Sequence, residues 1–347
     1  MKYALALAGG GTRGAFQAGV KTALDELGKE VCAIAGTSIG AVNGAVFAMG
    51  NSAVDLWAGI SVNDIVDVPD KNSNLLSPSS IFDFAKNASE GGFDNTPFRD
   101  FLNTVIDEEA IRRSGTDYGL CTFSIDTKKS VELFIDKIPE GQLTEYILAS
   151  ACFPMFRPVT IDGASFSDGG LRNNLPLNML IDRGYDTIIS VSVRGIGLLR
   201  EADKCGVNVI KINSPSPEVG LMEFDRDAIV RSIKSGYFEC MKSFCRYCGD
   251  IYYIDTASYH DAVSKFGTAP VSGMEQAAKL LNIDRFRGVT FESLSKEVLS
   301  TYESNLQLRL LTGYIKKGKS SFVRENMDIL GERFAAANAV VYLEKHL

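Results

Sequence analysis

The chain has 347 residues, of which 45% are hydrophobic and 23% charged, and this composition excludes intrinsic disorder over most of the length. Its formal net charge of −7 disfavours sequence-independent binding to nucleic acids or anionic bilayers, because neither is attracted by a net acidic surface. We therefore expect no nucleic-acid partner, and we expect any contact with a membrane to be local.

The first 60 residues predict strands that alternate with helices. Residues 3–8 form a short apolar run bounded by glycines, and residues 31–35 form a second run. Apolar residues recur at helical spacing over residues 16–27 and 39–49. This alternation predicts an α/β fold with three α/β/α layers, in which a mostly parallel central sheet is covered on both faces.

Residues 61–97 interrupt the alternation, because they are rich in Asn, Asp, Ser, Gly and Pro. Phe82, Phe84 and Phe93 are scattered through this segment. One interpretation is a surface excursion with local packing, and the other is a mobile lid over a site. The sequence leaves both open.

Two further buried strands are predicted at residues 187–193 and 207–212. The first of them follows a helix that begins near Pro176 and ends at Gly184. These elements extend the predicted sheet.

The C-terminal part of the chain predicts helices. An apolar stripe runs from residue 229 to residue 244, and further helices are expected within residues 274–282, 291–313 and 321–345. We place a soft boundary near residue 255. The predicted organisation is therefore an α/β domain over residues 1–255 and a helical C-terminal extension of unknown role over residues 256–347.

Several features predict a cytoplasmic protein that is at most peripheral to a membrane. The cysteines number seven, and their spacing is not that of a disulfide framework. The N-terminal apolar stretch is only about 6 residues long, shorter than the core of a secretory signal peptide. No charged residue lies between Glu30 and Asp55, but the polar residues and glycines there favour a buried strand, turn and helix over a membrane span.

A glycine-rich loop follows the first predicted strand. Gly9, Gly11 and Gly14 occupy the three glycine positions of a dinucleotide-binding fingerprint, and the loop opens a helix. That fingerprint also requires an acidic residue at the end of the second strand, where this chain has Ser38 instead. Nucleotide binding by this loop remains an alternative, but the missing acid argues against it.

The second predicted strand ends in Gly36-Thr37-Ser38-Ile39-Gly40. A Gly-x-Ser-x-Gly sequence between a strand and a helix is typical of a nucleophile elbow, where small neighbours allow a sharp turn that exposes the serine hydroxyl. The backbone N–H groups of the glycine loop lie at another helix start and can stabilise an oxyanion at the same point. The alternative is an ordinary glycine-rich turn in a tightly packed sheet.

A nucleophilic serine needs a base, and the chain has only two histidines, His260 and His346. Both lie outside the alternating α/β part, which disfavours a Ser-His-Asp triad and favours a carboxylate base. Asp168 lies in the turn-prone, nearly uncharged sequence Ser167-Asp168-Gly169-Gly170, where its pKa can rise toward useful basicity. An ordinary Asp-Gly-Gly turn is the alternative.

Five segments in the same order resemble the patatin-like phospholipases. They are the glycine loop at residues 9–14, the serine elbow at residues 36–40, the small-residue and proline segment at residues 149–159, the Asp-Gly-Gly turn at residues 168–170, and the Asn-Leu-Pro sequence at residues 174–176. The resemblance covers roughly residues 1–250. It implies an α/β/α fold with a Ser-Asp catalytic dyad.

The resemblance also implies residue roles. Ser38 corresponds to the nucleophile and Asp168 to the base, which accounts for the scarcity of histidine. The oxyanion side corresponds to Gly9, Gly10, Gly11, Arg13 and Ile39. No metal ion or cofactor is implied, and the Cys245-x-x-Cys248 pair is too isolated for a zinc site.

The activity implied by the resemblance is that of a lipid acyl hydrolase of the phospholipase A or lysophospholipase type, which cleaves carboxylic esters through an acyl-enzyme. Its partner would be a lipid, presented at a membrane surface, as a monomer or in a micelle. A second alternative, beside nucleotide binding, is a regulated effector or binding module with low basal hydrolysis. In that case residues 256–347 engage a protein partner.

Overall fold

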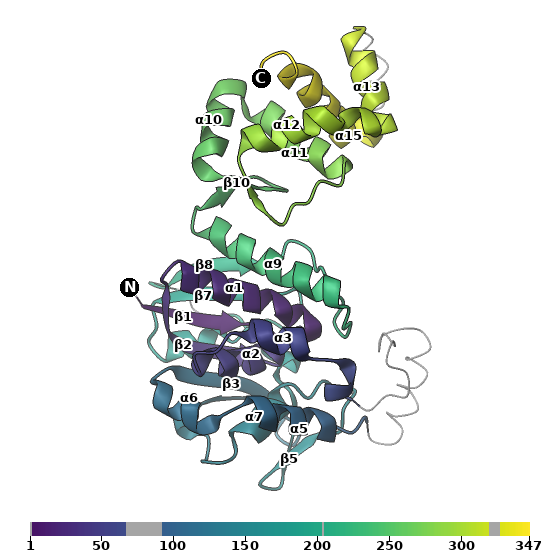
Figure 1. Cartoon of the computed structure of the whole chain (residues 1–347). Helices are drawn as coiled ribbons and strands as arrows, with labels where there is room; N and C mark the ends of the chain where they lie inside the picture. The colour runs from purple at the N-terminus through teal and green to yellow at the C-terminus, as the bar shows by residue number, and fades with distance from the viewer. Residues whose placement is uncertain (1, 67–91, 203–204, 319–326) are drawn as a thin grey trace. The chain divides into compact units, whose positions relative to one another are not determined.

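The computed structural model describes residues 2–66, 92–202, 205–318 and 327–347. The chain divides into two compact units, Met1–Cys240 and Met241–Leu347 (Figure 1). The division falls inside helix α9 (Arg226–Ser243), earlier than the boundary near residue 255 that the sequence indicated. The first part of α9 packs closely on helix α1 (Ala15–Glu26), since a Cβ on Gly236 would overlap the carbonyl oxygen of Phe16.

The first unit contains an eight-stranded sheet. Its strands are β1 (Lys2–Leu7), β2 (Glu30–Thr37), β3 (Asp117–Ser124), β4 (Lys129–Phe134), β5 (Val159–Ile161), β6 (Ala164–Asp168), β7 (Thr187–Ser192) and β8 (Asn208–Asn213). Five of them run parallel in the order β3-β2-β1-β7-β8. At one side, β4 and β6 pair antiparallel with β3, and β5 pairs antiparallel with β6. The predicted mostly parallel sheet is confirmed, with an antiparallel part that the sequence did not indicate.

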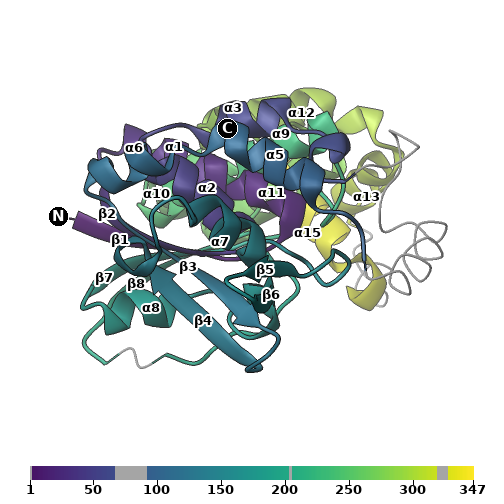
Figure 2. The same ribbon diagram turned by 90° about the horizontal axis from the view of Figure 1, so that it is seen from below.

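Helices cover both faces of this sheet (Figure 2). Helices α1, α2 (Ile39–Ala48) and α7 (Leu143–Ser150) lie on one face, and α8 (Leu177–Asp182) lies on the other. Small side chains of β1 and β2 face α8, where Ala4, Ala6, Ala33 and Ala35 form a core cluster with Leu180. The predicted three-layer arrangement is thus confirmed.

Helix α2 explains the long uncharged stretch of the sequence. Every residue from Ile39 to Ala48 is buried, so the helix has no polar face. Among the described helices, none is both long enough and apolar enough to span a bilayer. The interpretation of this stretch as a buried strand, turn and helix is therefore confirmed.

The remaining helices of the first unit are short. They are α3 (Ala53–Gly59), α5 (Thr96–Val105) and α6 (Glu108–Ser114). Phe93 pairs with Phe156 through an isolated parallel bridge. Most of the segment read either as a surface excursion or as a lid, including Phe82 and Phe84, lies outside the described residues.

The second unit is mainly helical, as expected. Its helices are α10 (Thr256–Phe266), α11 (Thr268–Leu280), α12 (Phe291–Thr301), α13 (Leu306–Lys316) and α15 (Met327–Leu343). Helix was predicted within residues 291–313, and the α-helix there is interrupted by a 3₁₀ turn at Tyr302–Ser304, after which the Asn305 side chain caps α13. A small sheet of β9 (Tyr247–Cys248), β10 (Tyr253–Asp255) and β11 (Gly288–Val289) was not predicted.

Candidate active site

Three segments that are far apart in the sequence meet at the carboxyl edge of the parallel strands. The glycine loop follows β1, Ser38 follows β2, and Asp168 ends β6. β1 pairs with β2, β2 pairs with β3, and Asp168 lies opposite Thr122 of β3. Ligand sites of open parallel sheets lie at this edge.

Ser38 stands in a strained strand-to-helix turn. Its φ of 56° and ψ of −127° are unusual for a residue with a side chain. The flanking glycines are required by close packing, because a Cβ on Gly36 would overlap the carbonyl oxygen of Gly40, and a Cβ on Gly40 would overlap that of Leu7. The turn has the geometry of a nucleophile elbow at the N-terminus of α2.

The Asp168 carboxyl group lies beside the Ser38 hydroxyl in the wall of one cavity, and hydrogen bonding from this hydroxyl lowers its pKa. Its Oδ1 also accepts the backbone N–H of Gly170 at 2.7 Å. Asp168 is only 5% exposed, and this burial raises the pKa of its carboxyl from 3.8 to about 6, although both hydrogen bonds oppose the rise. At neutral pH the carboxyl is therefore mostly ionised, and it takes up a proton more readily than an ordinary aspartate.

Residues around the pair fix its position. Ser150 Oγ accepts the backbone N–H of Ser38 at 2.9 Å and donates to the carbonyl oxygen of Cys121 at 2.6 Å. The backbone N–H of Asp168 donates to the carbonyl oxygen of Cys152 at 2.8 Å. The segment at residues 149–159 thus holds both Ser38 and Asp168. The sequence marked this segment by resemblance alone and did not assign Ser150 a role.

The glycine loop adjoins Ser38, but its backbone N–H groups differ in whether they already have a hydrogen-bond acceptor. The N–H of Gly9 donates to the carbonyl oxygen of Asn174 at 3.0 Å and is therefore engaged. Gly10, Gly11 and Ile39 line the cavity beside Ser38. Within the described residues, the backbone N–H groups of Gly10 and Gly11 have no hydrogen-bond acceptor. These two groups are available to a ligand.

Arg13 is directed elsewhere. Its guanidinium donates to the carbonyl oxygens of Val219 and Arg194, and the residue is not among those that line the cavity. It connects the glycine loop to two neighbouring segments of the first unit. Arg13 is thus held between these segments and does not line the cavity.

Close packing also accounts for the glycines of the loop. A Cβ on Gly10 would lie 2.5 Å from Cγ2 of Val193, and a Cβ on Gly11 would overlap the carbonyl oxygen of Leu221. Packing against the protein itself therefore accounts for these glycines without a bound pyrophosphate.

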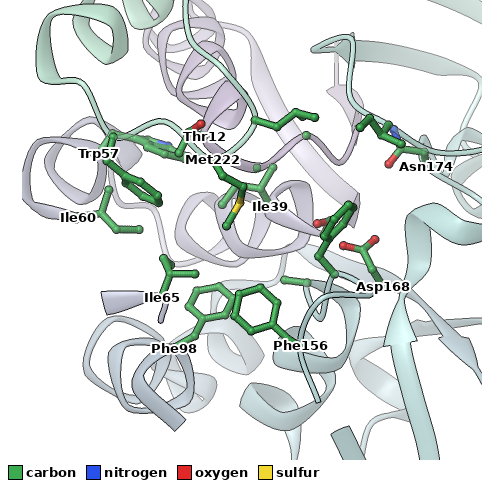
Figure 3. A pocket seen from close by; sticks show the side chains of 18 residues that line it. Thr12, Ile39, Trp57, Ile60, Ile65, Phe98, Phe156, Asp168, Asn174 and Met222 are labelled. Carbon is green, nitrogen blue, oxygen red and sulfur yellow. The ribbon is translucent and has the colours of Figure 1, made fainter. Parts of the chain in front are cut away.

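A cavity of about 110 Å³ adjoins the pair (Figure 3). In this view Asp168 and Asn174 lie toward one end, and Trp57, Ile60 and Ile65 lie toward the other. Most of the lining is apolar, formed by Ile39, Trp57, Ile60, Ile65, Phe98, Ala151, Phe153, Phe156, Ile196, Leu221, Met222 and Phe224. The cavity suits a hydrocarbon chain whose polar end lies beside Ser38.

A polar network supports the elbow from the side of β4. Oε1 of Glu132 accepts Nδ2 of Asn173 at 2.8 Å, and Oε2 accepts Nδ2 of Asn178 at 2.7 Å. The carbonyl oxygen of Asn173 in turn accepts the hydroxyl of Thr37, the residue before Ser38, at 2.8 Å. Both asparagines are buried, so their amides depend on these partners.

Replacing Glu132 with alanine is expected to destabilise the first unit by about 1–3 kcal/mol, because the buried Asn178 amide loses its acceptor. Chemical denaturation measures this change. Glu109→Ala removes an exposed carboxylate that pairs with Arg113 and is the matched control, with almost no change expected. Equal stability of the two variants would contradict the proposed support.

The two histidines belong to the second unit. His346 Nδ1 lies 2.6 Å from the carbonyl oxygen of Tyr342, and His260 makes an edge contact with the Tyr259 ring. Within the described part of the chain no disulfide occurs, and no cluster of three or more metal-binding side chains is present. The candidate site is therefore built from Ser38, Asp168 and backbone groups of the first unit.

The chain is similar in sequence to known proteins. The model of the family described as "Patatin-like phospholipase" matches residues 5–181, just over half of the chain. Patatin-like phospholipase domain-containing protein 7 of Rattus norvegicus is 30% identical over 195 residues, which are 55% of this chain and 13% of that protein. An uncharacterised NTE family protein of Mycobacterium bovis is 30% identical over 207 residues, which are 58% of this chain and 52% of that protein. The chain thus matches about half or less of these relatives.

One solved structure is also similar. The crystal structure of VipD from Legionella pneumophila aligns with 98% of this chain and 89% of that chain, with a TM-score of 0.45 and 13% sequence identity.

Proposed function

The chain belongs to the patatin-like phospholipase family, and from this premise we propose that its first unit is a lipid acyl hydrolase that uses Ser38 and Asp168 as a catalytic dyad. The substrates would be phospholipids, lysophospholipids or neutral acyl lipids. One observation carries the proposal: a serine in a strained elbow lies beside a buried carboxylate at the wall of an apolar cavity.

The proposed reaction has two stages. As Ser38 Oγ attacks the ester carbonyl carbon, its proton passes to the Asp168 carboxylate, and the carbonyl oxygen gains the negative charge. Collapse of this intermediate breaks the bond to the alcohol, which takes the proton from Asp168. Water then attacks the acyl-enzyme and gives a proton to Asp168, and Ser38 is restored as the fatty acid leaves.

The negative charge on the carbonyl oxygen needs hydrogen-bond donors. We assign this role to the backbone N–H groups of Gly10 and Gly11, which have no acceptor among the described residues, and of Ile39 at the start of α2. Gly9 and Arg13, expected on the oxyanion side, would instead position the loop through Asn174 and Val219. Such donors supply the electrostatic stabilisation that a metal ion supplies in other hydrolases, so the proposal includes no metal or cofactor.

The test is acyl release from a panel of phospholipids, lysophospholipids and neutral acyl lipids, together with labelling by a fluorophosphonate probe. The proposal expects release from at least one lipid class and a covalent adduct on Ser38. Protein that releases fatty acid but is not labelled, or that is labelled equally after Ser38→Ala, would contradict the dyad. Turnover that appears only with an added protein partner would favour the regulated effector.

Neither histidine is expected to take part in the reaction. His260→Ala and His346→Ala should each leave turnover within a few-fold of the parent, whereas loss of a general base costs about 10² to 10⁴. Steady-state hydrolysis of a soluble ester measures this. A loss in the larger range in either variant would mean that a histidine, and not Asp168, is the base.

A further inference from the structure

A group of exposed apolar side chains lies at the rim of the candidate active site. The side chains of Ile196, Leu198 and Leu199 are 64%, 57% and 68% exposed, and Leu171 is 38% exposed. We call these four residues the rim patch. Among the described residues of the first unit, only Ile125 and Val230 are comparable exposed apolar side chains. The exposed apolar surface of this unit is thus concentrated beside the site, and concentrated apolar surface marks an interaction.

The rim patch is continuous with the cavity and with the dyad. Ile196 lines the cavity although most of its side chain is exposed, so the cavity reaches the surface at this residue. The N–H of Leu198 donates to the carbonyl oxygen of Gly170 at 2.9 Å, and the N–H of Asn174 donates to that of Leu198 at 2.7 Å. The apolar side chains therefore project from a segment whose backbone is hydrogen-bonded to the turn that follows Asp168.

Close backbone packing holds this segment in place. A Cβ on Gly195 would overlap the carbonyl oxygen of Gly9, and a Cβ on Gly197 would lie 2.6 Å from that of Gly170. The segment at residues 195–197 thus packs tightly between the glycine loop and the Asp-Gly-Gly turn. Because the backbone of this segment is fixed, the side chains of the two leucines that follow it stay exposed to water. This exposure is unfavourable unless another apolar surface covers the side chains.

The charge around the rim patch is opposite to that of the whole chain. Arg172 and Arg194 are exposed beside it, whereas Arg200 is paired with Glu132 at 3.1 Å, and Glu201 is the only acidic residue within residues 194–201. The chain as a whole carries a formal charge of −7. A local excess of arginine around apolar side chains fits a surface with anionic head groups above hydrocarbon.

We propose that the rim patch docks the first unit on an anionic lipid surface, with Leu198 and Leu199 inserted among the acyl chains. This inference rests on the proposed function, because a lipid substrate has to pass from its layer into the cavity beside Ser38. Docking at Ile196 places the mouth of the cavity against the lipid, so that an acyl chain moves between two apolar environments. A protein partner would use the same leucines but would not need the cavity beside them.

The experiment uses the full chain in two forms. Binding is measured by co-sedimentation of Ser38→Ala protein with vesicles of phosphatidylcholine, with and without phosphatidylglycerol. Hydrolysis is measured with active protein on the mixed vesicles and on a soluble short-chain ester, and the ratio of the two rates is compared. The test variant is Leu198→Ser with Leu199→Ser, and Val230→Ser on α9, 49% exposed and away from the cavity, is the matched control.

The parent and the control are expected to bind the mixed vesicles more tightly than phosphatidylcholine alone, and less tightly as salt is raised. The double variant should bind at least tenfold less tightly, and its ratio of vesicle to soluble-ester hydrolysis should fall by a similar factor. A melting curve like that of the parent shows that the variant is folded.

The outcomes separate this inference from the proposed function. Vesicle binding through the two leucines without hydrolysis by the parent would retain docking and remove the proposed activity. Hydrolysis by the parent with unchanged vesicle binding by the double variant would retain the activity and overturn docking. Sedimentation velocity supplies a third arm, since a parent dimer that the double substitution dissociates would make the rim patch a protein interface and overturn the proposal.

Discussion

Replacing Ser38 with alanine is expected to lower acyl release by a factor on the order of 10⁴ or more, because no oxygen remains to form the acyl-enzyme. The backbone donors and the apolar cavity are retained, so residual rate above the uncatalysed reaction is expected. Hydrolysis of a soluble ester measures the loss without a contribution from binding to a lipid surface.

The fold should tolerate this substitution. The Ser38 hydroxyl does not cap α2, and alanine meets the same backbone strain at a φ of 56° that serine does. We expect the melting temperature of Ser38→Ala to stay close to that of the parent. Ser300→Ala, which removes an exposed hydroxyl from α12, is the control and should keep full activity. Near-normal release by folded Ser38→Ala would show that the nucleophile lies elsewhere.

The central strands could be predicted because buried strands appear in the sequence as runs of apolar residues. β1, β2 and β7 are parallel strands inside the sheet, and such strands read as short apolar runs. β4 is an antiparallel strand whose residues are mostly half-buried, and its sequence Lys-Ser-Val-Glu-Leu-Phe carries no such run. The strands of the second unit are two or three residues long, which is too short for any periodicity to appear.

The dyad could be located in the sequence because each of its two members lies in a recognisable local pattern. The residues that support the dyad could not be located in this way. Glycines flank Ser38 and follow Asp168, and each pattern reflects a turn in its own segment. Ser150 and Glu132 act through contacts that exist only after β3 has placed β4, β6 and α7 around the elbow. The engagement of the Gly9 N–H likewise depends on Asn174, far along the chain. Contacts of this kind produce no local sequence pattern from which they could be predicted.

Replacing Asp168 with asparagine is expected to lower acyl release by a factor of about 10² or more while it preserves the fold. The amide is nearly the same shape as the carboxyl, and its oxygen still accepts the N–H of Gly170. In the parent, the pKa of about 6 requires activity to fall as the pH drops below 6, since the protonated carboxyl cannot accept the Ser38 proton. The variant should lose this acidic limb from its pH profile.

Stability gives an independent readout of the same carboxyl. Its pKa is about 6 in the folded protein and about 3.8 in the unfolded chain, so the folded state binds more protons between these values. The parent should therefore become less stable as the pH rises from about 4 to about 6, by an amount on the order of 3 kcal/mol for a buried carboxyl with this shift. Asparagine carries no charge and avoids this cost.

We accordingly expect Asp168→Asn to melt at the same temperature as the parent or higher at pH 7.5, and its advantage should shrink as the pH falls toward 4. A carboxyl that only shapes the turn would behave in the opposite way, with a lower melting temperature at every pH and near-normal turnover per folded molecule. The two measurements belong on the same preparations. Normal specific activity in folded Asp168→Asn protein would end the Ser-Asp assignment, even if Ser38 were labelled, because a labelled serine shows only that its hydroxyl is reactive and not which group accepts its proton.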